Sequence, residues 1–320
     1  MRVLIYLVTC LTFAGFAPSC REIQKAESFL YTPLAGEDNL VFTSFRHKEE
    51  EDLYLLYSKN GMAWKPLASG ASFMSIKGSG YGFRDPWVGV GPNGVCRMLW
   101  TTGQVGMLGY AESRDLIDWT QPRLIRVMKN YDNALNHWAP EAFYDRDRGE
   151  WTVFWSSTVK GEFADTDAGG DVNHRVYACT TRDFRSMSDA FLFFDPGHNC
   201  IDATIHEHNG QFYLFYKDER VNPWMKFVAY ATGPSPRGPW TIQGRTSDAQ
   251  WIEGPSAIDI NGRMYVYYDW HDNGRYGGMV LSDDGKWNDR TLAMTFPSGH
   301  RHGTVVRVSQ EVADRLLARE

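Results

Sequence analysis

Three acidic residues stand at similar places in this sequence: Asp85, Asp202 and Glu253. Each lies beside a proline or a small residue, at the start of an apolar stretch that ends in a turn. A fourth stretch shares the design, and the four are Arg84-Asp85-Pro86-Trp87, Trp138-Ala139-Pro140-Glu141, Ile201-Asp202-Ala203-Thr204 and Glu253-Gly254-Pro255-Ser256. Carboxyl groups that meet in one cavity can give a proton to one oxygen and take a proton from water. Three of them together would suit the cleavage of a glycosidic bond.

Each of the four stretches opens a β-rich unit, and the units repeat along the chain. A unit contains a strand, a tight turn, a strongly aromatic strand and a Ser or Thr turn near a tryptophan. The aromatic strands cover residues 96–100, 151–155, 212–216 and 264–268. Two of the units turn at Asn-Gly pairs, 209–210 and 261–262. Asn-Gly between alternating strands is a strong hairpin signal.

The two ends of the chain supply a fifth unit in halves. Residues 40–45 and 53–58 form strands that lack an inner partner, and residues 302–308 form a lone inner-type strand. We therefore predict an all-β fold, a five-bladed β-propeller over residues 38–309, whose ring is closed when the C-terminal strand joins the N-terminal blade. A β-sandwich is the alternative, but it does not explain why the units begin near an acid. Residues 310–320 are expected to form a tail or a short helix.

Five motifs in this order resemble glycoside hydrolase family 43, a family of exported five-bladed propellers that act on plant-type glycans. They are Arg84-Asp85-Pro86, Trp138-Ala139-Pro140-Glu141, Ile201-Asp202-Ala203, Glu253-Gly254-Pro255 and His302-Gly303. Each motif alone is weak, whereas all five at blade spacing are specific, and the resemblance covers residues 38–308. The 117 residues from Asp85 to Asp202 and the 51 from Asp202 to Glu253 suit a base and a modulator two blades apart, with the acid one blade later.

The resemblance implies an inverting mechanism with Asp85 as the general base and Glu253 as the general acid. Inverting enzymes hold these two carboxyl groups ~6.5–9.5 Å apart, which admits the attacking water. The acid must stay protonated near neutral pH, so its pKa must be raised. Asp202 is expected to raise it through like charge and to orient Glu253. Each acid also has a structural alternative: a turn cap for Asp85, a strand-end acid for Asp202 and a surface residue for Glu253.

Six further residues are candidates for substrate binding: Arg84, Trp87, Trp138, Glu141, His206 and His302. The arginine can hold a carboxylate or a sugar hydroxyl, and the tryptophans can stack on a sugar ring. Glu141 and His302 match positions that the family places near its site, and His206 follows Asp202 on the same strand. Each has a structural alternative: a salt bridge for the arginine, core packing for the tryptophans and His206, and a hydrogen-bonding scaffold for Glu141.

No group of residues has metal-ligand spacing, so we expect no required cofactor and no metal. In some relatives the histidine that corresponds to His302 lies near calcium in the axial channel. A structural calcium there is the alternative, although calcium prefers oxygen ligands. Residues 58–64 and 282–287 resemble the Asp-box turns of sialidases. A sialidase also needs an arginine triad and a tyrosine nucleophile, and no Tyr-Glu pairing is evident.

Composition narrows the range of partners. The 320 residues are 43% hydrophobic and carry a net charge of -6, without a basic block or a basic-aromatic stripe. Nucleic acid is therefore not an expected partner, and an oligosaccharide or polysaccharide is. Cys96, Cys179 and Cys200 are an odd set, of which the first two belong to apolar strands and are assigned to the core. We expect a monomer.

The first residues indicate export. Met1-Arg2 precedes an apolar run from Val3 to Phe16, and Ala17-Pro18-Ser19-Cys20 follows. Residues 1–20 thus resemble a bacterial lipoprotein signal peptide, in which Cys20 would carry the lipid and provide the only membrane attachment. Residues 21–37 would be a linker. We expect a periplasmic or cell-surface lipoprotein, with free secretion as the alternative.

Taken together, these observations predict an exported inverting glycosidase. It would remove terminal arabinofuranosyl, xylosyl or galactofuranosyl groups from plant-type or microbial polysaccharides. Two alternatives remain: a non-catalytic surface propeller lipoprotein that binds glycans, and a related propeller glycosidase of the fructan or sialic-acid type.

Overall fold

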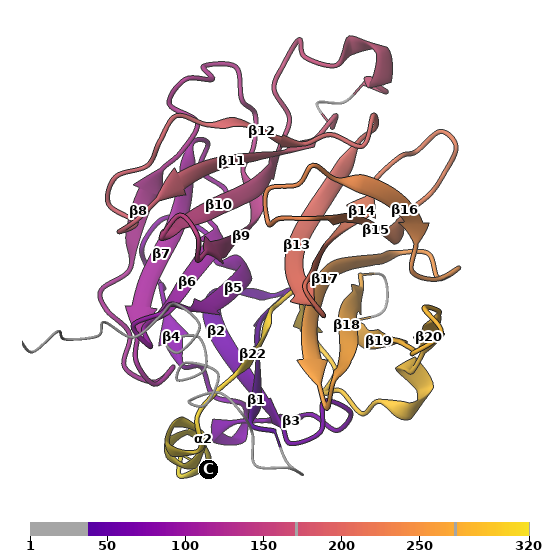
Figure 1. The fold of residues 1–320 in the computed structure, drawn as a ribbon. Helices are drawn as coiled ribbons and strands as arrows, with labels where there is room; N and C mark the ends of the chain where they lie inside the picture. The colour runs from indigo at the N-terminus through magenta and orange to yellow at the C-terminus, as the bar shows by residue number, and fades with distance from the viewer. Residues whose placement is uncertain (1–37, 170–171, 272–273, 320) are drawn as a thin grey trace, which may run out of the picture. The chain divides into compact units, whose positions relative to one another are not determined.

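Five antiparallel sheets surround a common axis in the computed structural model (Figure 1). The structure describes residues 38–169, 172–271 and 274–319. Each sheet is one blade, and the chain completes one blade before it enters the next, except at the ends. The predicted five-bladed β-propeller is confirmed. The predicted signal peptide, Cys20 and the linker lie outside the described residues.

Four blades consist of consecutive strands, numbered from the inner to the outer strand. The second blade has β5 (Arg84–Val90), β6 (Cys96–Thr101), β7 (Met107–Ser113) and β8 (Arg123–Arg126). The third has β9 (Trp138–Asp145), β10 (Glu150–Ser157), β11 (Arg175–Thr181) and β12 (Phe191–Phe194). The fourth has β13 (Cys200–His208), β14 (Gln211–Asp218), β15 (Phe227–Gly233) and β16 (Thr241–Arg245). The fifth has β17 (Ile252–Ile260), β18 (Arg263–Trp270), β19 (Arg275–Leu281) and β20 (Trp287–Asp289).

The first blade combines both ends of the described chain, as predicted. It contains β1 (Leu40–Arg46), β2 (Glu49–Ser58), β3 (Lys65–Pro66), β4 (Met74–Ser75), β21 (His300–Arg301) and β22 (Val305–Arg307). Both β21 and β22 pair with β1, so the inner strand is interrupted between them. A side chain at Gly303 would place its Cβ 1.5 Å from the Thr43 carbonyl oxygen, so only glycine fits at this interruption. The remaining elements are three short 3-10 helices, η1 (Ala68–Gly70), η2 (Ala164–Thr166) and η3 (Thr291–Ala293), and helix α2 (Gln310–Leu317).

The hydrophobic core is divided into five clusters, one at each contact between neighbouring blades. The alternation of side chains along a strand explains this division. Val41 packs in the cluster with the second blade, whereas Leu40 and Phe42 pack in the cluster with the fifth blade. The middle of the inner and second strands is therefore buried on both faces. The last cluster, between the fifth and the first blade, closes the ring.

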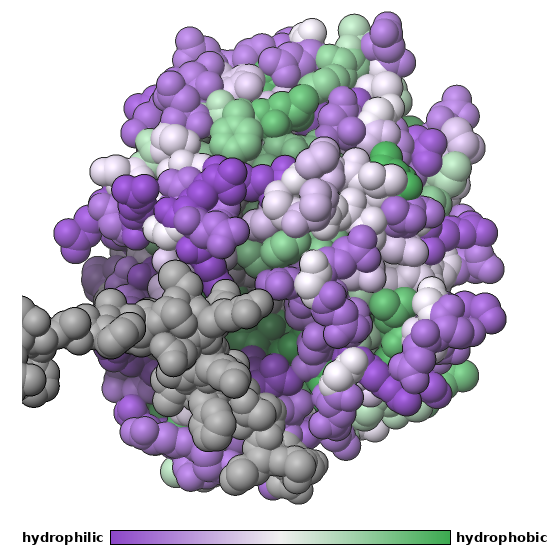
Figure 2. Space-filling view, in the orientation of Figure 1, coloured by the Kyte–Doolittle hydropathy of each residue, from purple (hydrophilic) through white to green (hydrophobic). Residues whose placement is uncertain are grey.

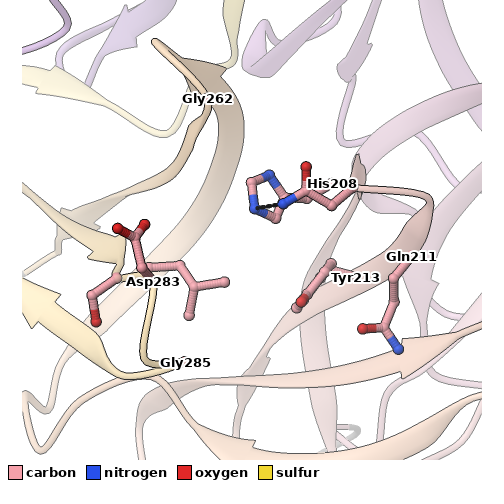
Figure 3. Close-up of a pocket in the computed structure, with 9 residues that line it drawn as sticks. His208, Gln211, Tyr213, Gly262, Asp283 and Gly285 are labelled. Atoms are coloured by element: carbon pink, nitrogen blue, oxygen red, sulfur yellow. Dashed lines mark hydrogen bonds between the residues drawn. The ribbon is translucent and has the colours of Figure 1, made fainter.

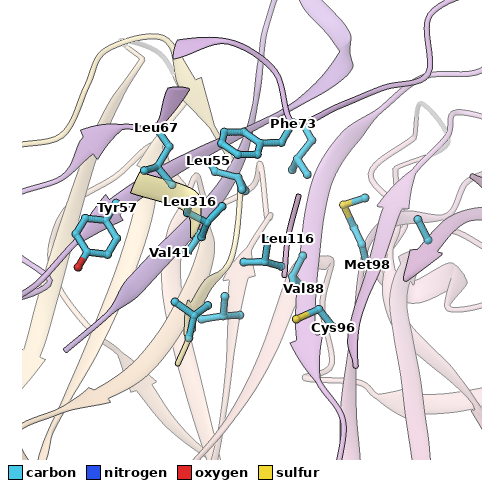
Figure 4. Close-up of a cluster of buried hydrophobic side chains, with 14 of the residues drawn as sticks. Val41, Leu55, Tyr57, Leu67, Phe73, Val88, Cys96, Met98, Leu116 and Leu316 are labelled. Atoms are coloured by element: carbon cyan, nitrogen blue, oxygen red, sulfur yellow. The ribbon is translucent and has the colours of Figure 1, made fainter. Parts of the chain in front are cut away.

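Helix α2 belongs to the cluster between the first and second blades (Figure 4). Its Leu316 and Ala313 are fully buried, and Leu316 lies in the same cluster as Val41, Val88 and Met98. The Ser309 side chain caps the helix by accepting the Val312 N–H at 3.3 Å. The helix stands where the sequence predicted a short one.

The turns that resemble Asp-boxes are structural. Ser58 Oγ accepts the Gly61 N–H, and Asn60 Oδ1 accepts the next two N–H groups. The same arrangement follows Ser113 and Thr181, and a looser one follows Ser282. Each turn joins the third and fourth strands of its blade, at the end of the ring opposite to the starts of the inner strands. These turns therefore connect the two outer strands of a blade and lie far from the predicted acids.

The surface in the view of Figure 1 is mostly hydrophilic, and hydrophobic residues gather over β12 (Figure 2). Phe191 and Leu192 of that strand are 37% and 43% exposed. Among the described residues, no helix combines the length and the apolar character that crossing a bilayer requires.

We expect Arg307→Ala to destabilise the propeller by about 3 kcal/mol, because it leaves a buried carboxylate unpaired. Arg307 of β22 holds both oxygens of Asp38 at 3.0 Å, and the Asp38 side chain is only 3% exposed. Denaturant unfolding measures the change. As a control, Arg245→Ala breaks an ion pair with Asp248, which is 87% exposed, and should cost less than ~1 kcal/mol. Equal losses in the two variants would show that the Arg307 pair does not stabilise ring closure.

Candidate active site

Four inner strands begin with one residue in the left-handed conformation. The φ angles are 51° at Asp85, 47° at Ala139, 58° at Asp202 and 56° at Gly254. The register between the inner and second strand shifts at each of these places, which marks a β-bulge. Asp85 and Asp202 occupy the left-handed position itself, whereas Glu253 lies one residue before it. The motifs therefore share a backbone conformation, whereas their acids stand at different positions relative to it.

Glycine is required at the fifth-blade position. Besides its positive φ, Gly254 lies against the imidazole of His302, and a Cβ there would lie 2.6 Å from the ring. Non-glycine residues adopt the left-handed conformation at a cost of roughly 1–2 kcal/mol, which aspartate tolerates better than most. The two aspartates thus hold a strained conformation at the same end of two blades, which is common at functional sites.

One side chain near the end of each second strand reaches the next blade. Four residues share this position, opposite the residue before each bulge: Thr101, Ser156, Lys217 and Asp269. Ser156 Oγ accepts the Asp202 N–H at 3.0 Å, and Asp269 Oδ2 accepts the His302 N–H at 3.1 Å. These bonds fix where the inner strands start relative to each other.

Thr101 makes the same contact and also holds the predicted base. Its Oγ1 accepts the Ala139 N–H at 2.8 Å and donates to Asp85 Oδ2 at 2.7 Å. The carboxylate of Asp85 is therefore oriented by a hydroxyl that is itself held by the neighbouring blade.

The structure brings the three predicted acids together around His302. The imidazole Nδ1 lies 3.5 Å from Asp85 Oδ1 and 3.9 Å from Asp202 Oδ2. The same Asp202 oxygen accepts the N–H of Gly254, the residue after Glu253, at 3.1 Å. Three blades and the closing strand thus contribute to one buried cluster. The structure thus places His302, a predicted binding residue, beside Asp85 and Asp202.

Glu253 is held between two cations that the sequence analysis missed. Lys217 Nζ lies 2.7 Å from Oε2, and Arg301 Nη2 lies 3.0 Å from Oε1. The pair belongs to an alternating chain of charges, whose members in order are Lys226, Glu219, Lys217, Glu253, Arg301 and Asp269. A buried lysine at the end of the aromatic strand 212–216 was a readable signal, because an interior lysine needs an acidic partner.

The surrounding charges favour protonation of Asp202 over that of Glu253, whereas the prediction was that Glu253 is protonated. Burial, reinforced by the negative charge of Glu253, raises the pKa of Asp202 to about 7. Burial also acts to raise the pKa of Glu253, but the charge and the hydrogen bond of Lys217 outweigh it, and the pKa falls to about 2. The expectation of a raised pKa at Glu253 is therefore wrong for the ligand-free protein. Of these two carboxyl groups, Asp202 therefore holds a proton more readily than Glu253.

Two of the predicted binding residues are accessible. The Arg84 side chain is 45% exposed, and its nearest acidic partner is Glu50 at 3.8 Å. Trp138 is 39% exposed, and its ring lies 4.8 Å from the His174 ring. Both residues stand directly before a bulge, at the same end of the ring as the acids.

Two other predicted binding residues, Trp87 and Glu141, are buried and have structural roles. Trp87 is 5% exposed and packs edge-on against Trp151 of the third blade, so it cannot stack on a sugar. Glu141 is 5% exposed, and burial raises its pKa well above the usual value. It therefore fits the scaffold alternative.

His206 lies towards the other end of the inner strand and away from the acids. Its Nε2 and the Nδ1 of His208 both contact Asp259 Oδ1, at 3.0 and 2.8 Å. His208 lines a separate pocket of about 240 Å³, with Tyr213 beside it and Asp283 across the gap (Figure 3). That pocket lies at the hairpin end of the fourth and fifth blades.

Metal binding receives no support from the side chains. Within residues 38–169, 172–271 and 274–319, no three His, Cys, Asp or Glu side chains are grouped so that they could hold a metal ion. Calcium in the channel stays a prediction.

We expect Asp202→Asn to stabilise the fold, and to do so more at pH 8 than at pH 5. The native pKa of Asp202 lies near 7, above the ~3.9 of the unfolded chain, so the native state keeps its proton over a range in which the unfolded state has lost it. The wild type therefore loses stability as pH rises through this range, by up to about 4 kcal/mol. The asparagine avoids this loss, and denaturant unfolding at both pH values measures it.

Asp147→Asn serves as the matched control, because Asp147 is exposed in the β9–β10 turn. It should change stability by less than ~0.5 kcal/mol at either pH. A stabilisation by Asp202→Asn that does not grow between pH 5 and pH 8 would contradict the raised pKa.

Comparison with known proteins identifies the family. A family model described as a probable glycosyl hydrolase domain, related to family 43, matches residues 37–314. An α-L-arabinofuranosidase of Bifidobacterium longum is 30% identical over 138 residues, which are 39% of this chain and 13% of that protein. A β-xylosidase of Xylanibacter ruminicola is 28% identical over 96 residues, which are 29% of this chain and 26% of that protein. These alignments thus span about an eighth and a quarter of the curated relatives.

Solved structures agree on the fold. An α-L-arabinofuranosidase from Lactobacillus brevis superposes with a TM-score of 0.51 at 16% identity, over 73% of this chain and 93% of that one. An endo-1,4-β-xylanase from Bacteroides thetaiotaomicron gives a TM-score of 0.54 at 14% identity, over 83% and 92% of the two chains. Because the family model covers most of its length, the chain belongs to the glycosyl hydrolases related to family 43.

Proposed function

We propose that this protein is an inverting glycoside hydrolase that removes terminal sugars from a polysaccharide. The observation that supports it most is the meeting of Asp85, Asp202 and Glu253 around His302 and Gly254. A structural turn cap or a surface acid would have no reason to be buried beside two other carboxyl groups.

The proposed reaction uses two of the three acids directly. Glu253 donates a proton to the glycosidic oxygen while the bond from that oxygen to the anomeric carbon breaks. Asp85 accepts a proton from the water that attacks the same carbon from the opposite face. Thr101 orients Asp85 through the 2.7 Å hydrogen bond. The products are a free sugar of inverted configuration and the shortened glycan.

Glu253 needs a proton before it can act as the acid, and Asp202 is the nearby group that holds one near neutral pH. Two neighbouring carboxyl groups of this kind share one proton. In the free protein the two cations favour the ionised form of Glu253. We propose that a bound sugar shifts the proton from Asp202 to Glu253 by weakening the Lys217 contact, which disfavours the anion on Glu253, while Asp202 becomes the anion beside His302.

Arabinofuranosyl and xylosyl groups are the favoured leaving sugars, because the two curated relatives are named for arabinofuranosidase and xylosidase activity. A galactofuranosyl group is a third candidate from the sequence. We also propose export and lipid attachment at Cys20, which rest on the sequence alone.

One observation favours the non-catalytic alternative. Glu253 has a cation at each oxygen, and a carboxylate held in this way suits a fixed binding surface as well as an acid. In that case the protein would bind a glycan without cleaving it, and an assay for released sugar separates the two functions.

We expect Asp85→Asn and Glu253→Gln each to lower kcat/KM by about 10²–10⁴-fold, the usual contribution of a general base or acid. Release of sugar from arabino- and xylo-oligosaccharides and from nitrophenyl arabinofuranoside, xyloside and galactofuranoside measures it. The loss in Glu253→Gln should be smaller on the nitrophenyl substrates, because a nitrophenolate leaves without a proton. The matched control is again Asp147→Asn, which should retain wild-type turnover.

Hydrolysis that either variant leaves unchanged would refute the assigned roles. Binding of these glycans without sugar release by the wild type would instead establish the non-catalytic function.

We expect Lys217→Met to move the basic limb of the pH profile of kcat/KM to higher pH. Lys217 is only 3% exposed, and its loss removes the cation that lowers the pKa of Glu253 most. Glu253 would then keep its proton at higher pH. The profile is measured between about pH 5 and pH 9, the range around the pKa of Asp202.

The control for this experiment is Lys286→Met, which removes a lysine that is 79% exposed in the turn before β20. Its pH profile should match the wild type. A Lys217→Met profile that coincides with both would show that the ionised state of Glu253 does not limit turnover.

A further inference from the structure

A second feature of the site is a pocket that is lined by two arginines and two histidines. The pocket measures about 420 Å³ and is lined by His47, Arg84, His271, Gly274, Gly299 and Arg301. None of the described residues that line it is acidic. Its volume falls within the ~300–1,000 Å³ of small-molecule sites in proteins.

Arg84 offers the pocket a guanidinium group that is not committed elsewhere. Its Nε lies 3.8 Å from Glu50 Oε1, which is too far for a hydrogen bond, and its side chain is 45% exposed. The guanidinium carbon lies 5.5 Å from the centre of the Phe45 ring, within the range of a cation–π contact. Within the described residues its guanidinium nitrogens have no hydrogen-bond acceptor, so they are free for a ligand.

Arg301 offers a second group, which is held in a fixed orientation. Its Nε binds Asp269 at 2.6 Å and its Nη2 binds Glu253 at 3.0 Å, and its side chain is 8% exposed. The third nitrogen, Nη1, has no acceptor among the described residues. An arginine fixed in this way loses little side-chain entropy when it binds an anion, because two carboxylates have already ordered it.

We propose that this pocket binds the anionic group of an acidic sugar, a carboxylate or a sulfate ester, with Arg84 and Arg301 as its donors. The planar guanidinium presents paired N–H groups that match such an anion, and bonds of this kind are stronger than those between neutral groups. The proposal rests on the proposed function in one respect: the acidic sugar would adjoin the sugar that is cleaved, since Arg301 touches Glu253. The substrate class is then an acidic polysaccharide.

The same contact would link substrate recognition to the reaction. An anion bound to Arg301 shares that cation with Glu253 and so weakens the stabilisation of the ionised acid. Substrates that carry the charge would therefore bring Glu253 closer to its protonated form. Neutral substrates would leave the pair of cations on Glu253 unchanged.

The test compares three sugars that differ only at C6: methyl β-D-glucuronide, methyl β-D-glucoside and methyl β-D-glucoside 6-sulfate. Binding to the full chain is measured by calorimetry at about 20 mM salt, at which charge interactions are weakly screened. We expect an anionic sugar to bind about tenfold more tightly than the glucoside, which is the effect of one charge-assisted hydrogen bond. Tighter binding of the glucuronide indicates a uronate substrate, and tighter binding of the sulfate indicates a sulfated one.

Two variants locate the site. Arg84→Ala should reduce the preference to within about twofold, whereas Arg263→Ala, which removes an exposed arginine at the opposite end of the ring, should retain it. If Arg84→Ala unfolds, the wild type still tests the proposal. Raising the salt to about 500 mM should reduce its preference for the anionic sugars over the glucoside at least threefold. Equal affinity for all three sugars, or a preference that neither Arg84→Ala nor salt reduces, overturns the proposal.

This result is independent of the test of hydrolysis. A protein that cleaves neutral glycosides without any preference for anions would retain the proposed function and lose this inference. A protein that prefers anions and releases no sugar would retain this inference and lose the proposed function.

Discussion

The structure depends on one repeated contact, in which a side chain near the end of a second strand holds the start of the next inner strand. Thr101 and Ser156 use a hydroxyl for this contact, and Asp269 uses a carboxylate. Lys217, at the same register, reaches past the backbone to the side chain of Glu253. The apolar clusters between the blades would allow the sheets to slide, whereas a directional hydrogen bond fixes their relative height. This is why acids from three blades meet at one level.

The positions that make the ring also make the site. The second-strand position is a hydroxyl in the second and third blades, where Thr101 and Ser156 accept a backbone N–H of the next blade and Thr101 also orients Asp85. It is an ion in the fourth and fifth blades, where it meets Glu253 or the closing strand. The consequence is electrostatic: a buried chain of alternating charges keeps Glu253 ionised and leaves the proton on Asp202. Buried ion pairs repay the loss of hydration only when each charge has a partner. The site therefore stores its proton away from the group that is proposed to donate it.

Much of the fold was open to prediction. The repeated apolar strands, the Asn-Gly turns and the unmatched strands at the two ends led to five blades and to closure by the C-terminal strand. The three acids were named from their motifs and from the resemblance to family 43, and the structure brings them near one another. The surrounding residues were harder: Trp87 and Trp138 precede similar strands, yet one is buried against Trp151 and the other is exposed. Trp87 stands two residues after the left-handed residue of its strand, whereas Trp138 stands one residue before it, and the sequence does not mark where that residue lies.

The sequence by itself determined what depends on local order: the strands, their turns, the number of blades and the identity of the acids. These follow from side-chain period and turn chemistry, which act over a few residues. Only the tertiary structure decided which charges meet. Lys217 and Glu253 are separated by 36 residues, and Arg301 lies 48 residues beyond Glu253. The Lys217 contact arises where the fourth and fifth blades pack together, and the Arg301 contact arises from closure of the ring. The pKa values of Glu253 and Asp202 follow from such contacts, because a pKa depends on charges a few ångströms away in space.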